Sequence, residues 1–364
     1  MNKLQNAREQ IDSIDAEMSK LFCRRMKAAR EAAEYKQENG LPVFDSSREA
    51  EVILRNASLI ADDELKPYYI SFLKYNMTLS KSYQHRLLEG MKIAYSGVPG
   101  AFGYIAAKSV FPDGIPVSYG SFGEAYRAVE EGKCDCAVLP IENSFAGDVA
   151  QVFDLMFFGS LFVTGIYDLE IVQNLLGNQG ATTNTVKEVI SHPQALDQCA
   201  SYIEKHGYIP VEASNTAVAA KQAAQSGRTD IAAIASVETA VIYGLNVIDT
   251  NINQSNANTT RFAVFSRAQN RAADTDNHFI MFFTVKNEAG SLGRAVSVIG
   301  ENGFNMKALK SRPTKELIWD YYFLVESLGN INGEKGRKMI SELSEVCSSL
   351  KIVGSFEKEI MLKN

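Results

Sequence analysis

The sequence predicts a multidomain fold with three successive parts of different class. An all-α head is expected over residues 1–90, an α/β region with a largely parallel sheet over 91–268, and an α+β tail of ferredoxin-like order over 277–364. The prediction rests on a long helical apolar period at the start, alternating strands and helices in the middle, and a βαββαβ pattern at the end. A chain of 364 residues has room for two or three domains.

Composition and charge restrict the class of protein. The content of 46% hydrophobic and 22% charged residues is ordinary for a globular protein. No apolar run reaches the roughly 18 residues that would span a bilayer, and residues 1–10 show no secretory signal. A net charge of −6 without a basic run argues against nucleic acid as the main partner. We therefore expect a cytoplasmic protein whose partners include neither nucleic acid nor a membrane.

The cysteines and histidines do not form a metal-binding pattern. The five cysteines are scattered, and Cys134 and Cys136 are too close together for the usual zinc spacing. The four histidines lie far from this pair and from one another. We expect reduced structural thiols, no metal and no cofactor.

The head begins with one long predicted helix. Apolar side chains recur in steps of three and four from residue 4 to residue 35, which is the period of one helix face. At about 1.5 Å per residue this helix would exceed about 40 Å, so its apolar stripe needs partners. Asp45 or Ser46 is expected to be the N-cap of a second helix, and a third helix is expected from about Pro67 to Glu89, where Gly90 ends it.

The head also presents cations in two directions. Arg25 and Lys36 are eleven residues apart, almost three full turns, and therefore share a helix face. Arg8 points about 100° away from that face. A solvated basic surface is the common reason for any single one of these charges. The other two predicted helices add further polar residues, which are Arg48, Glu49, Ser80 and Gln84.

Over residues 4–88 this combination resembles the helical chorismate mutase family. The resemblance implies an intertwined homodimer in which Arg8 crosses to the partner's site. It also implies conversion of chorismate to prephenate, an intramolecular rearrangement that needs a compact conformation and charge stabilisation at the breaking ether oxygen. The matching positions are Arg8, Arg25, Lys36, Asp45, Arg48, Glu49, Ser80 and Gln84.

The resemblance assigns roles to the side chains of this set. The arginines would hold the two substrate carboxylates, because a guanidinium fork matches carboxylate geometry. Lys36 and Gln84 would donate hydrogen bonds to the ether oxygen, and Glu49 would accept one from the substrate hydroxyl. Lys36, Gln84 and Glu49 are therefore the catalytic candidates of the head.

In the α/β region, polar motifs directly follow predicted strands. The expected strands are residues 92–95, 135–139, 186–190, 208–211 and 230–234. The motifs are Glu142-Asn143-Ser144, Ser191-His192-Pro193-Gln194 and Ser214-Asn215-Thr216. In open α/β sheets the carboxyl ends of strands form the ligand crevice, and helix N-termini there suit an anion. A glycine-rich run at 97–103 lacks the spacing of a phosphate loop, so nucleotide binding is not expected.

Across residues 92–266 these motifs, with those at 97–102 and 258–262, resemble the prephenate dehydratase family in the same order. The resemblance implies a bilobed fold like that of periplasmic binding proteins, with a second lobe at about 170–248 and the substrate between the lobes. The implied reaction converts prephenate to phenylpyruvate with loss of carbon dioxide and the ring hydroxyl. The implied substrate-binding positions are Glu142, Asn143, Ser144, Ser191, His192, Gln194, Ser214, Thr216, Asn258, Thr260, Arg261 and Phe262.

The resemblance gives the essential catalytic role to Thr260, which precedes an alternating apolar run at 262–265. A positioned Thr260 hydroxyl, backed by Asn143 or Gln194, would hydrogen-bond or protonate the leaving hydroxide. Aromatisation of the ring drives the rest of the reaction. The enzyme mainly has to help the hydroxide leave.

Some positions keep a second interpretation. Ser191 or Ser214, taken alone, would be an ordinary helix N-cap. Strand alternation turns Arg261 away from Thr260, so a structural ion pair is as well supported as a substrate contact. Gly103 stands where the family often has a hydroxyl residue, which would weaken one substrate contact.

The tail resembles the ACT regulatory domain family at residues 287–292 and 309–313. Its expected elements are strands at 278–285, 305–311, 318–326 and 350–356 and helices at 290–302 and 333–348. The resemblance implies that phenylalanine binds between paired tails and inhibits the dehydratase more than the mutase. Lys310 replaces the glutamate that the family usually has, so altered feedback is expected. The implied effector positions are Ala289, Gly290, Ser291, Leu292, Lys310, Ser311, Arg312 and Pro313.

The sequence leaves two alternatives for the middle region. It could act on arogenate, the transaminated form of prephenate, although a mutase that makes prephenate on the same chain favours prephenate. It could also be a non-catalytic module that binds or senses a small acid, because a bilobed fold alone does not establish catalysis. A homodimer or a higher homo-oligomer is expected in either case.

Overall fold

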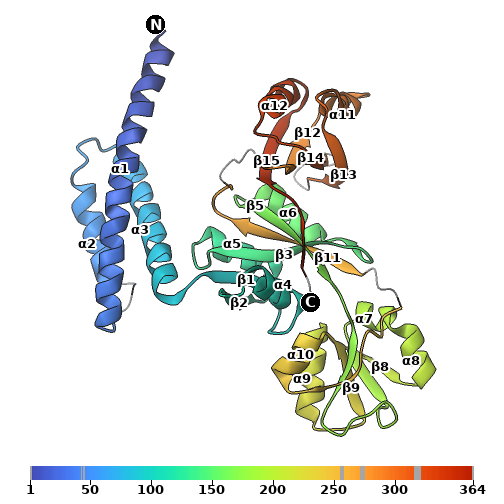
Figure 1. Ribbon diagram of the computed structural model, residues 1–364. Coiled ribbons are helices and arrows are strands. Elements are labelled where there is room, and N and C mark those ends of the chain that lie inside the picture. Colours follow the sequence, from blue (N-terminus) through green and yellow to red (C-terminus); the bar gives the residue numbers. More distant parts are fainter. Residues whose placement is uncertain are drawn as a thin grey trace. The chain divides into compact units, whose positions relative to one another are not determined.

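The computed structural model of the protein describes residues 2–41, 43, 46–254, 258–270, 275–314 and 321–362. The chain divides into two compact units, which can be followed by colour in Figure 1. The first unit is Met1–Lys92 with Glu131–Asp135, and the second is Ile93–Glu130 with Cys136–Asn364. Within the described residues, no helix is both long enough and apolar enough to cross a membrane.

The regular structure described in the first unit is helical. Its helices are α1 (Lys3–Glu38), α2 (Ser46–Ala57) and α3 (Lys66–Glu89). Leu73 and Met77 of α3 are buried, as is Ala33 of α1. Gly90 ends α3 with a φ of 88°, a backbone conformation that favours glycine. The predicted long first helix and the predicted end of the third helix are confirmed.

A stripe of apolar side chains along α1 stays exposed. The exposed fraction is 55% for Leu4 and Ile11, 56% for Ile14 and 57% for Leu21. These residues recur at helical spacing and so belong to one side of α1. A contiguous apolar surface of this kind is typical of an interaction site.

The α/β region contains a seven-stranded sheet in the order β16-β5-β11-β3-β1-β2, with β4 paired to β3. Its strands are β1 (Lys92–Ser96), β2 (Ile115–Tyr119), β3 (Cys136–Asn143), β4 (Gly147–Asp148), β5 (Phe162–Glu170), β11 (Thr259–Ser266) and β16 (Ile360–Leu362). Helices α4 (Phe102–Val110), α5 (Phe122–Glu130) and α6 (Ala150–Phe158) accompany it. Leu139, Phe262 and Phe265 lie in its core, almost fully buried.

This sheet is mixed rather than largely parallel. Strand β1 pairs with β3 in parallel, as predicted, but β11 is antiparallel to both β3 and β5. The chain returns from the second lobe before it forms β11 and enters the sheet from the opposite end. The prediction of a largely parallel sheet is therefore wrong for the strand that carries Thr260.

A second, five-stranded sheet has the order β10-β6-β9-β7-β8. Its strands are β6 (Asn174–Gly177), β7 (Glu188–Ser191), β8 (Ile209–Glu212), β9 (Ile231–Ala235) and β10 (Asn246–Asp249). The helices around it are α7 (Pro193–Gln198), α8 (Ala200–His206), α9 (Thr216–Ser226) and α10 (Val237–Tyr243). Strand β7 is parallel to β8 and β9, which agrees with the predicted strands of the second lobe.

The tail forms a four-stranded sheet in the order β13-β14-β12-β15. Its elements are β12 (His278–Thr284), α11 (Ser291–Glu301), β13 (Asn305–Pro313), β14 (Tyr321–Leu328), α12 (Glu334–Val346) and β15 (Ser349–Phe356). Phe279, Met281 and Phe283 of β12 pack against Ile299 of α11 and Met339 of α12. The observed βαββαβ order is the predicted one. The first residues of the predicted strand 318–326 lie outside the described part of the chain.

Candidate functional site

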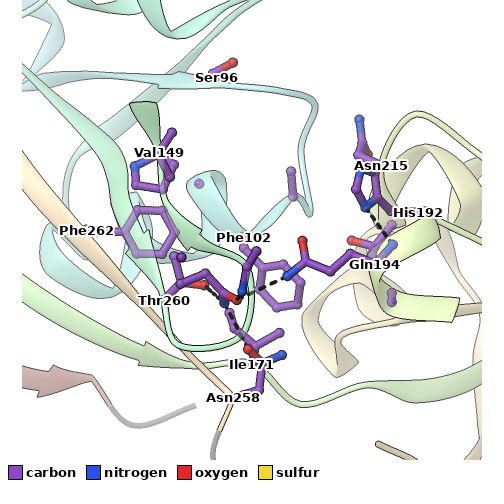
Figure 2. Close-up of a pocket in the computed structure, with 18 of the residues that line it drawn as sticks. Ser96, Phe102, Val149, Ile171, His192, Gln194, Asn215, Asn258, Thr260 and Phe262 are labelled. Atoms are coloured by element: carbon purple, nitrogen blue, oxygen red, sulfur yellow. Dashed lines mark hydrogen bonds between the residues drawn. The ribbon is translucent and has the colours of Figure 1, made fainter. Parts of the chain in front are cut away.

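The larger candidate site is a cavity of about 600 Å³ between elements of the two α/β sheets. We call it the interlobe cavity. Figure 2 shows Thr260 and Phe262 on one side of it and Gln194 and Asn215 on another. The first lobe contributes residues from β3, β11 and the start of α6, and the second lobe contributes residues at the starts of α7 and α9.

Asn143 is the centre of the hydrogen-bond network in this cavity. Its Nδ2 atom donates to Thr260 Oγ1 at 2.8 Å and to Asn258 Oδ1 at 2.9 Å. Its Oδ1 atom accepts from Gln194 Nε2 at 3.1 Å. Thr260 and Asn143 are direct partners across β11 and β3. Because Thr260 Oγ1 accepts the bond from Asn143, its own hydroxyl hydrogen is available to a substrate.

Two further glutamines line the cavity, and one of them belongs to this network. Gln198 Oε1 accepts from Asn258 Nδ2 at 2.9 Å, while its Nε2 atom is buried without a hydrogen-bond partner among the described residues. Gln173 also lines the cavity, and its Oε1 atom is likewise buried and unpaired there. Buried unpaired polar atoms in a cavity are candidates for ligand contacts. Sequence reasoning missed both, although Gln198 follows Gln194 by one turn of α7.

The predicted dehydratase positions divide into two groups. The interlobe cavity is lined by Asn143, His192, Gln194, Ser214, Thr216, Asn258, Thr260 and Phe262. Ser191 is fully buried and donates to the carbonyl of Ile234 at 2.6 Å. Ser144 Oγ accepts from the backbone N–H of Thr259 at 2.9 Å. Ser191 and Ser144 are therefore outside the cavity lining, and so are Glu142 and Arg261.

The N-caps at this cavity come from residues other than the two serines considered. His192 caps α7 by accepting from the N–H of Gln194, and Asn215 caps α9 by accepting from the N–H of Val218 at 2.8 Å. The cap interpretation of Ser191 and Ser214 is therefore wrong. Both helices begin at the cavity, where their N-termini favour a substrate carboxylate.

Arg261 belongs to a cluster of carboxylates. It contacts Glu142 at 3.2 Å and Glu326 at 2.7 Å, and it also pairs with Glu359. Burial would lower the pKa of Arg261, but hydrogen bonds and charges from Glu326 and its neighbours raise it above the ordinary value. Of the two interpretations that the sequence left open, the geometry matches the structural ion pair.

The helical unit contains a smaller cavity of about 160 Å³, which we call the head cavity. Its lining includes the predicted residues Arg25, Lys36, Arg48, Glu49, Ser80 and Gln84, together with Val43, Val52, Met77 and Lys81. Arg25 donates to Ser80 Oγ, and Lys36 Nζ donates to the carbonyl of Val43 at 2.7 Å. Gln84 is only 8% exposed. Six predicted residues from all three helices thus surround one cavity.

Two predicted residues are not among these six, and one further lining residue was not predicted. Arg8 does not line the head cavity of its own chain, and Asp45 lies outside the described residues. Lys81 was not predicted, yet it lines the cavity and contacts Glu49 at 2.8 Å. Its position three residues before Gln84 on α3 was the available signal, because residues at that spacing share a helix face.

The predicted effector positions of the tail also fall into two groups, around the start of α11 and on β13. Gly290 is the N-cap of α11 and lies in the left-handed region with a φ of 81°, and Ser291 beside it is buried. Lys310 instead extends to the α/β region, where Nζ donates to Glu142 Oε1 at 2.9 Å and to Asp148 Oδ1 at 2.5 Å. Arg312 donates to Asp154 Oδ1 at 3.1 Å. The remaining positions are Ala289, Leu292, Ser311 and Pro313, in the turn before α11, in α11 and in β13.

Comparison with known proteins assigns a family to each of the two parts of the chain that contain these cavities. Residues 7–85 match the family model of chorismate mutase type II, and residues 93–270 match that of prephenate dehydratase. A bifunctional chorismate mutase/prephenate dehydratase of Aquifex aeolicus (strain VF5) is 31% identical over 376 residues, which cover 99% of each chain. An arogenate dehydratase/prephenate dehydratase 1, chloroplastic, of Arabidopsis thaliana is 31% identical over 287 residues, or 74% of this chain and 73% of the plant protein.

A solved structure has the same fold. Prephenate dehydratase from Arthrobacter aurescens, in complex with L-Phe, has a TM-score of 0.68 and 23% sequence identity. The similarity covers 74% of this chain and 90% of that chain.

Because one chain contains a mutase unit and a dehydratase region, the protein belongs to the class of bifunctional enzymes that act on small organic acids. The alternative of a non-catalytic sensor is therefore wrong. The chain belongs to the bifunctional chorismate mutase/prephenate dehydratase family, which its relative from Aquifex matches end to end. It converts chorismate to prephenate and prephenate to phenylpyruvate in the biosynthesis of phenylalanine.

Proposed function

We propose that the interlobe cavity is where prephenate loses carbon dioxide and water, with Thr260 as the catalytic hydroxyl. The observation that carries this proposal is the bond of 2.8 Å from Asn143 Nδ2 to Thr260 Oγ1. That bond fixes the oxygen and leaves the hydroxyl hydrogen available to a leaving group, which is the requirement for a general acid. Gln194 fixes Asn143 in turn from the second lobe.

The head cavity is the proposed site of the mutase reaction. Arg25 and Arg48 bind the carboxylates of chorismate, and Lys36 stabilises the ether oxygen as its bond breaks. The support is that the cavity gathers these cations next to a buried Gln84, whose amide donates at any pH. Glu49, held by Lys81, accepts from the substrate hydroxyl.

Incubation of the purified protein with chorismate alone tests the two assignments together. We expect prephenate to appear first and phenylpyruvate to follow, each measured by chromatography. Prephenate without phenylpyruvate would contradict the assignment of the interlobe cavity. Unchanged chorismate, with added prephenate still consumed, would contradict the assignment of the head cavity.

Arogenate is the second candidate substrate of the interlobe cavity. The Arabidopsis relative carries both substrates in its name. The supply of prephenate by the same chain favours prephenate here. Measurement of kcat/KM on both acids decides between them, and a higher value for arogenate would reverse the assignment.

The tail, residues 277–364, is proposed as an ACT domain that binds phenylalanine and inhibits the dehydratase. The support is its βαββαβ order, the left-handed turn at Gly290 before α11, and the L-Phe in the Arthrobacter structure. Backbone groups at that turn suit the charged ends of an amino acid. Calorimetry with phenylalanine, together with dehydratase assays, tests this. No heat of binding at millimolar phenylalanine would remove it.

The chain is also proposed to act as a homodimer through its helical unit. The support is the exposed stripe of α1 and the absence of Arg8 from the head cavity lining among the described residues. In a dimer the stripe would be covered, and Arg8 would reach the partner's cavity. A cytoplasmic location stays a prediction from the sequence.

A further inference from the structure

Two carboxylates face each other at the rim of the interlobe cavity. Glu142 at the end of β3 and Asp148 on β4 are direct partners across this short antiparallel pair. Like charges directly opposite each other destabilise a strand pair. A cation that contacts both side chains would therefore stabilise the pairing of β3 with β4. Arg261 contacts Glu142 at 3.2 Å, but no contact with Asp148 is found among the described residues.

Lys310 of the tail supplies that cation. Its Nζ atom donates to Glu142 Oε1 at 2.9 Å and to Asp148 Oδ1 at 2.5 Å, and it lies 5.3 Å from the ring centroid of Phe153. The Lys310 side chain is only 20% exposed, so solvent screens these contacts weakly. Burial lowers the pKa of Lys310, but its two carboxylate partners raise it above the ordinary value, so the ammonium stays charged.

The strand pair that Lys310 contacts also contains Asn143. Asn143 follows Glu142 directly and is the partner of Gly147 across the same pair. Its Oδ1 atom accepts from the N–H groups of Phe145 at 3.0 Å and Ala146 at 2.9 Å in the connecting turn. Gly147 and Asp148 line the interlobe cavity. A shift of this turn would therefore move the amide that fixes Thr260.

We propose that Lys310 is a positioning residue of the dehydratase site, which joins β3 to β4 and so holds Asn143 against Thr260. This rests on the proposed roles of Asn143 and Thr260. It also gives Lys310 a role other than the effector contact that the family resemblance implied. The tail then takes part in building the active site, in addition to any ligand that it binds.

The tail has other attachments that do not involve Lys310. Lys351 Nζ donates to the carbonyls of Met156 and Phe157 at the end of α6, both at 2.9 Å. Phe157 stacks on Tyr322 of β14 with ring centroids 4.2 Å apart. Replacement of Lys310 should therefore leave the tail attached and affect the strand pair selectively.

The test compares Lys310→Met with wild type in both assays of the full-length protein. We expect dehydratase kcat to fall about 10-fold or more, with a smaller change in KM, because misplacement of a catalytic group by about 1 Å can cost up to about 10²-fold. Mutase kcat on the same chain should stay unchanged, which controls for folding and concentration. Lys310→Arg should keep most of the dehydratase activity.

A second variant separates charge neutralisation from simple packing. Asp148→Asn removes one of the opposed charges, so Lys310→Met/Asp148→Asn should regain dehydratase kcat relative to Lys310→Met, with Asp148→Asn alone as the reference. Lys307→Met is the matched control, because Lys307 is on the same strand but pairs with Glu326 and Glu359. We expect it to keep wild-type kcat.

Two outcomes would overturn the proposal. One is a dehydratase kcat of Lys310→Met equal to that of wild type. The other is a double variant no faster than Lys310→Met. Failure of the underlying site assignment is distinguishable, because it would appear as full activity of Thr260→Ala whatever the behaviour of Lys310.

Discussion

At the scale of single residues, Thr260 has the environment that its proposed reaction requires. It is held by Asn143 inside a cavity whose other polar atoms are mostly neutral amides and hydroxyls. A neutral donor suits a departing hydroxide better than a carboxylate would, because it adds no negative charge beside a substrate that already carries two carboxylates.

We predict that Thr260→Ala lowers dehydratase kcat by about 10² to 10⁴, the range typical of a lost general acid. Thr260→Ser should retain much of the activity, because it keeps the hydroxyl. Steady-state assays with prephenate measure both. Mutase activity in the same preparations is the control, and wild-type dehydratase kcat in Thr260→Ala would remove Thr260 from the mechanism.

For the head cavity, we predict that Lys36→Ala lowers mutase kcat by about 10² or more, by analogy with the loss of an oxyanion donor. Its bond of 2.7 Å to the Val43 carbonyl orients the ammonium before substrate binds. Consumption of chorismate measures the effect. Dehydration of added prephenate should proceed at the wild-type rate, and an unaltered mutase kcat in a folded dimer would contradict the role.

Gln84→Glu should make the mutase depend on pH. The glutamic acid donates a hydrogen bond only when protonated, and the ordinary pKa of its side chain is about 4.3. Turnover should therefore be highest at acidic pH and fall as pH rises through that pKa. Wild type, with a neutral amide, is the reference over the same range. A Gln84→Glu profile parallel to that of wild type would exclude this donor role.

Two of the residues that sequence reasoning missed share one physical cause. Gln198 and Lys81 lie one turn from predicted residues, on helix faces that the sequence pattern makes equivalent. The pattern alone does not determine which polar residues of such a face reach a cavity. The contacts of Gln198 with Asn258 and of Lys81 with Glu49 depend on the tertiary fold.

At the scale of elements, the helices of the head could be predicted from the sequence, because the apolar period and the terminating glycine are local features of the chain. The direction of β11 did not follow. A local alternating pattern predicts a strand at 262–265, but it carries no information on whether its partners β3 and β5 run parallel or antiparallel. The cap residues His192 and Asn215 were misassigned for a similar reason, since the helix starts differ by one residue from those considered.

The exposed stripe of α1 yields a prediction at this scale. Ile14→Glu places a charge within this stripe and should dissociate the dimer. Mutase activity should then be lost, because Arg8 of each chain is proposed to reach the head cavity of the other chain. Light scattering after gel filtration measures the mass. Ala16→Glu, about 200° around the helix from Ile14, is the matched control and should remain dimeric. A dimeric Ile14→Glu variant with full mutase activity would contradict the interface.

At the scale of the whole molecule, the two proposed catalytic cavities belong to different compact units. In the proposed mechanisms, the head cavity uses cations to stabilise a rearranging dianion, while the interlobe cavity uses neutral donors to release hydroxide. The tail is joined to the α/β region through Lys310, Arg312 and Lys351. The sequence predicted the order of these parts through their motifs. It did not predict the ionic contacts between tail and α/β region, because these join residues more than one hundred and fifty positions apart.

The most direct test of the central claim, that one chain performs two reactions at two separate sites, is product analysis of two single variants and their mixture with chorismate as the only substrate. We predict that Thr260→Ala stops at prephenate, that Lys36→Ala leaves chorismate largely unchanged, and that the mixture forms phenylpyruvate, because prephenate released by one variant is dehydrated by the other. Phenylpyruvate from Thr260→Ala alone, or an inactive mixture of two folded variants, would contradict the account.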